Sequence, residues 1–265
     1  PIKGVQVSAY IQSASDECSD VGLSSCTGLF LGSLNEPCSE RDNANCSAVS
    51  DENGVATFAG LGVNAPGNGA ARDVIIGFTY LSTTGVYGDH QGGWVDEDTP
   101  LTPATQRGAL RAAAEAAWQA IPGLPLHIFR LAGIYGPGRG PFEKVRQGTA
   151  RRIVKPGQVF SRIHVDDIAQ ALAASIARPR PGAIYNLCDD DPAPPEDVIA
   201  HAAHLLGLPV PEAVPHDAAD LSPMARSFYA ESKRVSNRRI KEELGVTLRY
   251  PDYRSGLAAL LAGGD

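Results

Sequence analysis

The sequence predicts an α/β protein in two parts, a β-rich segment over residues 1–72 and an α/β segment over residues 73–265. Two observations lead to this division. Four of the five cysteines fall within the first 46 residues. From residue 73 onward, short apolar runs typical of strands alternate with runs of helical periodicity. Strands that alternate with helices are typical of a sheet covered by helices, so the second part defines the fold class.

The N-terminal segment has the pattern of short strands and turns. Apolar residues alternate with polar ones over residues 2–12, which predicts a half-buried strand. Asn53-Gly54 precedes a second alternating run over residues 55–63, which predicts a hairpin. The run DENGVATF (51–58) resembles the small β-sandwich modules of bacterial surface proteins, so we expect a β-sandwich-like segment here.

The clustered cysteines predict disulfides. They form an even set in a polar segment, which indicates two bridges with three alternative connectivities and an oxidising compartment. Free thiols and a metal site are the alternatives. The paired short spacing of a zinc site, such as C-x2-C, is absent, so we assign no metal ligands. The four residues are Cys18, Cys26, Cys38 and Cys46.

The second part begins after a linker over residues 65–72 and can be divided into elements in order. Strands are predicted over residues 73–84, 124–135 and 183–189. A helix over 107–121 is expected to bury an apolar stripe, and further helices are expected later in the chain. The stripe consists of Leu110, Ala114, Ala117, Trp118 and Ile121, and the later helices span residues 165–177, 194–207 and 236–245.

The charge distribution argues against nucleic acid and membrane partners. The net charge is −7, and residues 1–78 hold three basic and nine acidic side chains, so there is no basic footprint. No run of 18 apolar residues is present. We therefore expect a small-molecule substrate and leave a homo-oligomer open. Because the chain begins at Pro1 without a signal peptide, we expect a processed chain or a fragment.

Four motifs in the second part occur in a familiar order. They are YLSTTGVYGD (80–89), RLAGIYGPGR (130–139), HVDDIA (164–169) and YNLCDD (185–190). With them, the stretch from Tyr80 to the C-terminus resembles an extended short-chain dehydrogenase/reductase of the NAD-dependent epimerase/dehydratase group. The resemblance implies the C-terminal part of a Rossmann-like, doubly wound fold and a cytoplasmic location. It also implies NAD or NADP as cofactor and hydride transfer to or from a carbonyl or hydroxyl group.

The resemblance assigns catalytic roles to three residues. Thr83 takes the place of the hydroxyl residue that holds the substrate oxygen. Arg107 and Arg111 stand where the family has its catalytic Tyr and Lys. An arginine stays protonated at any working pH, so it can polarise an oxygen or bind an anion but cannot shuttle a proton.

The resemblance also assigns binding roles. The residues that it places beside the cofactor are Ser82, Arg130, Tyr135, Gly136 and Pro137. Those that it places beside the substrate are Tyr87 and Arg139.

Departures from the family pattern leave a second interpretation open. The glycine-rich loop that holds the cofactor pyrophosphate at a helix N-terminus is not found. Its nearest match, residues 60–65, is followed by Pro66, Gly67 and Gly69, which exclude a helix. Thr84-Gly85 replaces the acidic pair of dehydratases, and Gly133 replaces the family's Asn. The alternative is a non-catalytic binding module, or a composite chain without intact activity.

Two further groups of polar residues remain. We assign a structural role to the first and no single role to the second. His164 with Asp166 and Asp167 is expected to begin a helix rather than to bind a metal. The acidic run Asp189–Asp191 follows a predicted strand, and its role is left open between a solvated loop and a cation site. If the second part forms half a sheet, we expect residues 2–12 and 54–63, or another chain, to cover its edge.

Overall fold

The computed structural model of the chain describes residues 6–8, 10–12, 47–49 and 75–264. The chain divides into two compact units. The smaller unit comprises Pro1–Thr79, Pro122–His127 and Ile176–Gly182, and the larger comprises Tyr80–Ile121, Ile128–Ser175 and Ala183–Asp265. No helix in the described part of the chain is long and apolar enough to cross a bilayer.

Short antiparallel strands make up what is described of the N-terminal segment. β1 (Gln6–Ser8) pairs with β3 (Ser47–Val49). β2 (Tyr10–Gln12) pairs with the first residues of β4 (Ile75–Thr83), with Tyr10 opposite Gly77. The predicted strand over 2–12 is therefore two strands, and the second lies at the edge of the sheet, as expected. The predicted hairpin over 54–63 and the four clustered cysteines lie outside the described residues.

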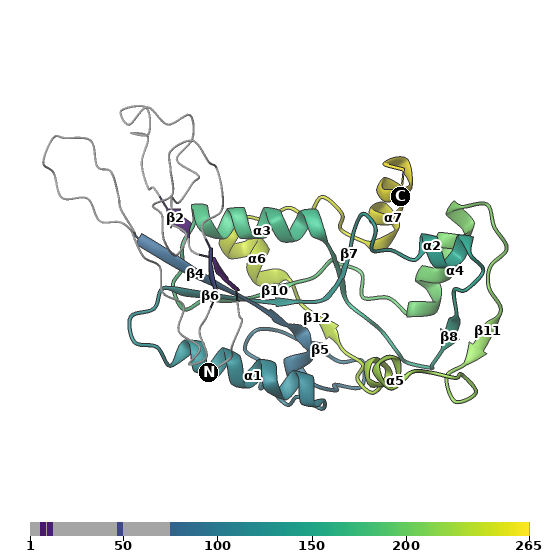
Figure 1. Ribbon diagram of the computed structural model, residues 1–265, viewed down its shortest axis with the longest axis horizontal. Helices are drawn as coiled ribbons and strands as arrows, with labels where there is room; N and C mark the ends of the chain where they lie inside the picture. The colour runs from purple at the N-terminus through teal and green to yellow at the C-terminus, as the bar shows by residue number, and fades with distance from the viewer. Residues whose placement is uncertain (1–5, 9, 13–46, 50–74, 265) are drawn as a thin grey trace, which may run out of the picture. The chain divides into compact units, whose positions relative to one another are not determined.

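The main sheet has the strand order β10-β6-β4-β2 and contains a parallel pair of strands. β6 (Leu126–Leu131) is buried along its whole length and pairs in parallel with β10 (Ile184–Leu187). Burial on both faces is typical of a parallel sheet covered by helices. Figure 1 shows helix α1 (Gln106–Gln119) on one side of these strands and α3 (Val165–Ala177) on the other. The prediction of an α/β fold is confirmed.

Helix α1 buries a different face from the predicted one. Leu110 is 65% exposed and Ile121 is 45% exposed, so the predicted apolar stripe is wrong at these positions, whereas Ala114 and Trp118 are half-buried. The buried positions are Gly108 and Glu115. Gly108 packs against the turn after β4, where a Cβ would lie 2.7 Å from the carbonyl oxygen of Gly85. Close backbone packing and a buried ion pair of Glu115, rather than apolar periodicity, decide which face of the helix turns inward.

The remaining elements follow the sequence prediction with three differences. The predicted strand over 124–135 is two strands, β6 and β7, because the chain leaves the main sheet at Ala132 and pairs with β9 instead. Helices α2, α5 and α7 were not predicted, nor were strand β9 and the strand pairs β8–β11 and β5–β12. The bounds are η2 (Thr84–Tyr87), β5 (Trp94–Val95), β7 (Gly133–Tyr135), α2 (Phe142–Arg146), β8 (Arg152–Val154), β9 (Arg162–His164), α4 (Pro195–Leu205), β11 (Ala213–Pro215), α5 (Pro223–Tyr229), β12 (Arg234–Val235), α6 (Arg238–Leu244) and α7 (Tyr253–Ala262).

The HVDD motif has the structural role expected of it. The backbone N–H of Asp166 donates to Nδ1 of His164 over 3.1 Å at the start of α3. The Asp167 carboxylate accepts from the backbone N–H groups of Arg249 and Tyr250, over 2.7 and 3.0 Å. These bonds fix the segment before α7 against α3, so the motif holds two parts of the larger unit together.

Candidate functional site

A cavity of about 1130 Å³ lies within the larger unit, at the carboxyl ends of β4 and β6. Its wall contains the turn after β4, the first residues of α1, strand β7 and residues 138–141. Residues 159–162, parts of α5 and α7, and side chains of α2, α4 and residues 231–235 also line it. Open α/β sheets bind ligands outside the carboxyl ends of their parallel strands. The cavity therefore lies where the fold class places a ligand site.

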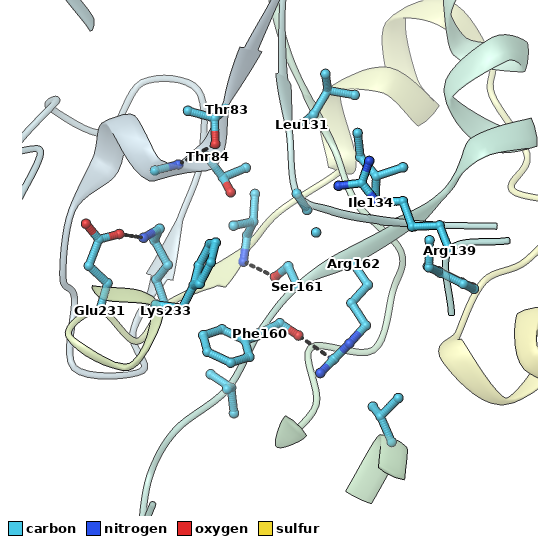
Figure 2. A pocket seen from close by; sticks show the side chains of 18 of the residues that line it. Thr83, Thr84, Leu131, Ile134, Arg139, Phe160, Ser161, Arg162, Glu231 and Lys233 are labelled. Atoms are coloured by element: carbon cyan, nitrogen blue, oxygen red, sulfur yellow. Dashed lines mark hydrogen bonds and ion pairs between the residues drawn. The ribbon is translucent and has the colours of Figure 1, made fainter. Parts of the chain in front are cut away.

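Thr83, the last residue of β4, presents its hydroxyl at the wall of this cavity. Its Oγ1 accepts a hydrogen bond from the backbone N–H of Gly85 over 3.2 Å, which caps η2. This bond uses the oxygen as an acceptor, so the hydroxyl proton remains available for a ligand. Figure 2 shows Thr83 and Thr84 on one side of the cavity and Phe160, Ser161 and Arg162 on another.

A buried polar network lies behind the end of β4. Ser82 donates to the Glu115 carboxylate, which forms a 2.8 Å ion pair with Arg130. Arg130 donates to the Tyr87 hydroxyl over 2.9 Å, and Tyr87 donates to the Asn186 side chain over 2.8 Å. All five side chains are buried. The network links β4, α1, β6 and β10, and it therefore fixes the strand end that carries Thr83.

Of the predicted residues in this network, Ser82 lines the cavity, whereas Tyr87 and Arg130 are not among its lining residues. Burial raises the pKa of Tyr87 to about 12, although the nearby Arg130 charge lowers it. Tyr87 is therefore a neutral hydrogen-bonding group at neutral pH. The predicted substrate role of Tyr87 and cofactor role of Arg130 remain predictions, and both side chains act through the network.

Three of the four predicted arginines, Arg107, Arg111 and Arg139, line the cavity. The Arg107 guanidinium lies 4.7 Å from the centre of the Phe228 ring. Arg111 donates to the Tyr80 hydroxyl and to the Leu81 carbonyl, over 3.2 and 3.3 Å. None of these partners carries a negative charge, so the two guanidinium groups at the start of α1 keep their positive charge available to a ligand.

Of the predicted cofactor residues at the end of β7 and in the loop after it, one lines the cavity and two do not. Tyr135 lines the cavity, packs closely on Gly256 and donates to the Asp252 carbonyl over 3.5 Å, and burial raises its pKa. Gly136 and Pro137 are not among the lining residues. A Cβ on Gly136 would lie 2.6 Å from a methyl group of Val165. Gly136 therefore permits close packing of the loop on α3, and its predicted cofactor role remains a prediction.

Sequence reasoning missed three basic groups of the cavity wall, Lys144, Arg162 and Lys233. The Lys233 ammonium donates to Glu231 over 2.6 Å and to the Gly88 carbonyl over 2.7 Å. Arg162 donates through Nη1 to the carbonyls of Phe160 and Ala193, over 2.8 and 3.1 Å. A basic residue between Ser161 and Ile163, at the start of a short strand, was the available signal for Arg162. Lys233 lies in an irregular segment that gave no such signal.

The cavity is strongly cationic. Its lining holds six basic side chains and one acidic side chain, Glu231, which is already paired with Lys233. Within the described ranges, no three His, Cys, Asp or Glu side chains come together as a metal site would require. A concave site of one charge sign raises the local concentration of oppositely charged ligands. The six basic residues are Arg107, Arg111, Arg139, Lys144, Arg162 and Lys233.

Asp189 is a buried carboxyl group close to this site. It is 1% exposed, and burial raises its pKa to about 8 while the Arg162 charge opposes the shift. Below that pH the folded protein keeps Asp189 protonated, whereas the unfolded chain ionises it above about pH 4. The folded state therefore binds the extra proton between these values, so stability contributed at Asp189 falls as pH rises.

Replacing Asp189 by asparagine is expected to stabilise the protein by about 1–2 kcal/mol at pH 8 and by less at pH 5. The amide stays neutral, so it does not have the penalty that the carboxyl acquires as pH rises. Urea unfolding of both proteins at the two pH values measures the difference. An equal difference in stability at pH 5 and pH 8 would show that Asp189 titrates normally.

The comparisons with known proteins agree with the fold. Residues 69–188 match the model of the NAD dependent epimerase/dehydratase family. The C-terminal part of this chain resembles an extended short-chain dehydrogenase/reductase. It has the C-terminal part of a Rossmann-like fold, as predicted.

Three relatives illustrate the range of similarity. Protein YeeZ of Escherichia coli (strain K12) is 34% identical over 176 residues, which cover 65% of this chain and 58% of YeeZ. A functionally unknown conserved protein from Silicibacter pomeroyi is 70% identical, with a TM-score of 0.68 over 71% of this chain and 66% of that one. The dTDP-glucose 4,6-dehydratase of Bacillus anthracis, solved in complex with NAD, shares the fold at 22% identity and a TM-score of 0.58, over 70% of this chain and 60% of that one. The chain therefore spans about 60% of the length of such relatives.

The described residues fit one end of a dinucleotide cofactor. The cavity beside Thr83 has the position and size for a nicotinamide ring and a substrate, as ligand cavities typically hold about 300–1,000 Å³. No strand followed by a glycine-rich turn and a helix, the element that binds pyrophosphate, occurs within residues 75–264. Residues 60–65, the nearest sequence match, lie outside the described part of the chain.

Proposed function

We propose that this protein is an NAD(P)-dependent oxidoreductase that acts on the carbonyl or hydroxyl group of a small molecule. The observation that carries the proposal is the cavity at the carboxyl ends of β4 and β6, with the Thr83 hydroxyl at its wall. The match to an NAD-dependent family supports it. The missing acid pair at Thr84-Gly85 favours reduction or oxidation over dehydration.

Thr83 is proposed to hold the substrate oxygen. Its own oxygen is fixed by the Gly85 N–H, so the hydroxyl proton can be directed at a ligand oxygen in the cavity. Glu115 is a positioning residue, because the hydrogen bond that it accepts from Ser82 keeps the end of β4 in place from the buried side. A hydrogen-bond donor aimed at a developing negative charge typically contributes about 3 kcal/mol to the rate.

Arg107 and Arg111 are proposed to stabilise negative charge rather than to move protons. Both line the cavity that Thr83 also lines, and within the described residues both have only uncharged partners. Their guanidinium groups stay protonated, so the proton that a reduced carbonyl needs must come from water or from another group. The cofactor, when bound, supplies or accepts the hydride. Arg139, on the opposite loop, is proposed to contact the substrate.

Ser82 and Tyr135 are the predicted cofactor residues that line the cavity. We propose that they contact the nicotinamide end of the cofactor. Three other predicted cofactor residues do not line the cavity and would act by supporting Ser82 and Tyr135. They are Arg130, Gly136 and Pro137. The choice between NAD and NADP is left to experiment. The pyrophosphate must be held by residues outside the described ranges or by a second copy of the chain.

Calorimetric titration of the purified chain with NADH and with NADPH tests this proposal. We expect one of them to bind with micromolar affinity, and the Asn237→Ala variant, altered away from the cavity lining, to bind it equally well. A cooperatively folded sample that binds neither cofactor would contradict the proposal. It would instead support the non-catalytic binding module.

A further inference from the structure

We propose that Arg162 anchors an oxyanion of the substrate, a carboxylate or a phosphate group, in the cavity. This inference deepens the proposed function. It rests on that function in one respect, namely that the bound anion is the substrate of the reaction. Arg162 has no role in the motifs that relate the chain to its family, and it was not among the residues predicted from the sequence. Its assignment comes from how its guanidinium is held, which charges surround it and what the cavity offers beside it.

The guanidinium of Arg162 is fixed along one edge only. Nη1 donates to the Phe160 carbonyl and to the Ala193 carbonyl. Phe160 and Ala193 also exchange two backbone hydrogen bonds, of 3.0 and 3.1 Å, so both acceptors belong to one rigid pair. No bond within the described part of the chain uses Nε or Nη2. These two donors form the fork that binds carboxylate or phosphate oxygens in pairs.

The positive charge of Arg162 has no acidic partner within salt-bridge distance in the part of the chain that the structure describes. Three acids act on its charge, Asp189, Asp191 and Glu196, and none forms an ion pair with it within the described residues. Burial raises the pKa of Glu196, which favours its neutral form. Asp191 is bonded to Arg254 over 2.6 Å. Asp189 has its pKa raised to about 8 by burial, so most of it is uncharged at neutral pH. A cation that has lost much of its water and has no counter-charge is stabilised by an anionic ligand.

The side chains around Arg162 in the cavity indicate the charge and the apolar character of the ligand. Arg139 and Lys144 line the same cavity and form no ion pair within the described ranges, so they extend the positive charge. Phe160 and Tyr229 lie edge to face, with ring centres 5.7 Å apart, and both line the cavity near Arg162. An acidic molecule with an apolar body matches this combination. Figure 2 shows Arg162 and Phe160 across the cavity from Thr83.

Calorimetric titrations with inorganic phosphate and with benzoate test the anchor without any cofactor. We expect the wild-type protein to bind at least one probe at millimolar concentration. Arg162→Gln is expected to weaken that binding about tenfold or more, as for loss of a charge-assisted bidentate contact, and Arg162→Lys to weaken it less. Arg238→Gln, which changes a side chain 74% exposed, serves as the matched control and is expected to bind like wild type. The probe that binds identifies phosphate or carboxylate as the preferred group.

Three results would overturn the anchor. They are absence of binding of both probes to the folded wild type, equal binding by Arg162→Gln, and loss of NADPH binding in Arg162→Gln. The last result would assign the anion site to a phosphate of the cofactor instead of the substrate. Urea unfolding of each variant shows whether it folds. If Arg162→Gln does not fold, the comparison of Arg162→Lys with wild type still tests the anchor. If the wild type binds an anion through Arg162 but neither NADH nor NADPH, the anchor stands and the oxidoreductase proposal fails.

Discussion

Replacement of Glu115 by alanine is expected to destabilise the protein by about 3–5 kcal/mol, because it leaves the buried Arg130 guanidinium without its counter-charge. Arg130 makes three hydrogen bonds to the Glu115 carboxylate, and the two side chains are 4% and 1% exposed. The substitution also removes the acceptor of the Ser82 hydroxyl. Three buried donor atoms, the Ser82 hydroxyl and Nε and Nη2 of Arg130, therefore lose their acceptor, and one buried charge loses its counter-charge.

Urea unfolding monitored by circular dichroism measures this effect. Glu242→Ala is the matched control, since its carboxylate is 60% exposed and pairs with Arg238 at 3.5 Å on the helix surface. Such an exposed pair contributes at most about 1 kcal/mol. If Glu115→Ala costs no more than Glu242→Ala, the buried network does not hold the end of β4, and the explanation for the inward face of α1 fails.

Replacement of Thr83 by valine is expected to lower kcat/KM for hydride transfer about a hundredfold, because the donor to the developing oxyanion is lost. Valine has almost the same shape, so the cavity keeps its form. The same change removes the cap on the Gly85 N–H, which is expected to cost about 1 kcal/mol of stability. The rate is measured with a carbonyl substrate found by screening for NAD(P)H oxidation.

Two variants separate catalysis from folding in this experiment. Thr83→Ser keeps the hydroxyl and is expected to retain most of the rate. Thr84→Val changes the neighbouring hydroxyl in the cavity wall and is expected to act like wild type. A Thr83→Val protein that is folded and has the wild-type rate would remove Thr83 from the proposed mechanism.

Regular elements with strong periodicity were predictable from the sequence. The apolar run around β6, the helix after HVDD and the helix that begins at Pro195 all appear where their patterns place them. The face of α1 was not predictable in the same way. Leu110 has the spacing of a core residue and is exposed, whereas Glu115 is buried. The reason is tertiary, because Glu115 is buried only with Arg130, a residue on another element.

The candidate site shows the same division between local and tertiary information. The motif around Thr83 identified the end of β4, and the cavity is there. Arg162 and Lys233 were missed because their roles depend on which carbonyls and carboxylates surround them after folding. Tyr87 has a motif position in common with the family, yet its hydroxyl is occupied by Arg130 and Asn186. A motif fixes where a residue lies in the chain but not which partner its side chain meets.

A crystal structure of the chain grown with saturating NADPH or NADH would test the central claim most directly. The account predicts density for the nicotinamide ring inside the cavity, against the Thr83 side of the wall and within hydrogen-bond reach of Ser82 or Tyr135. A structure with the fold described above, in which the cofactor is bound outside this cavity or is absent at saturating concentration, would contradict it.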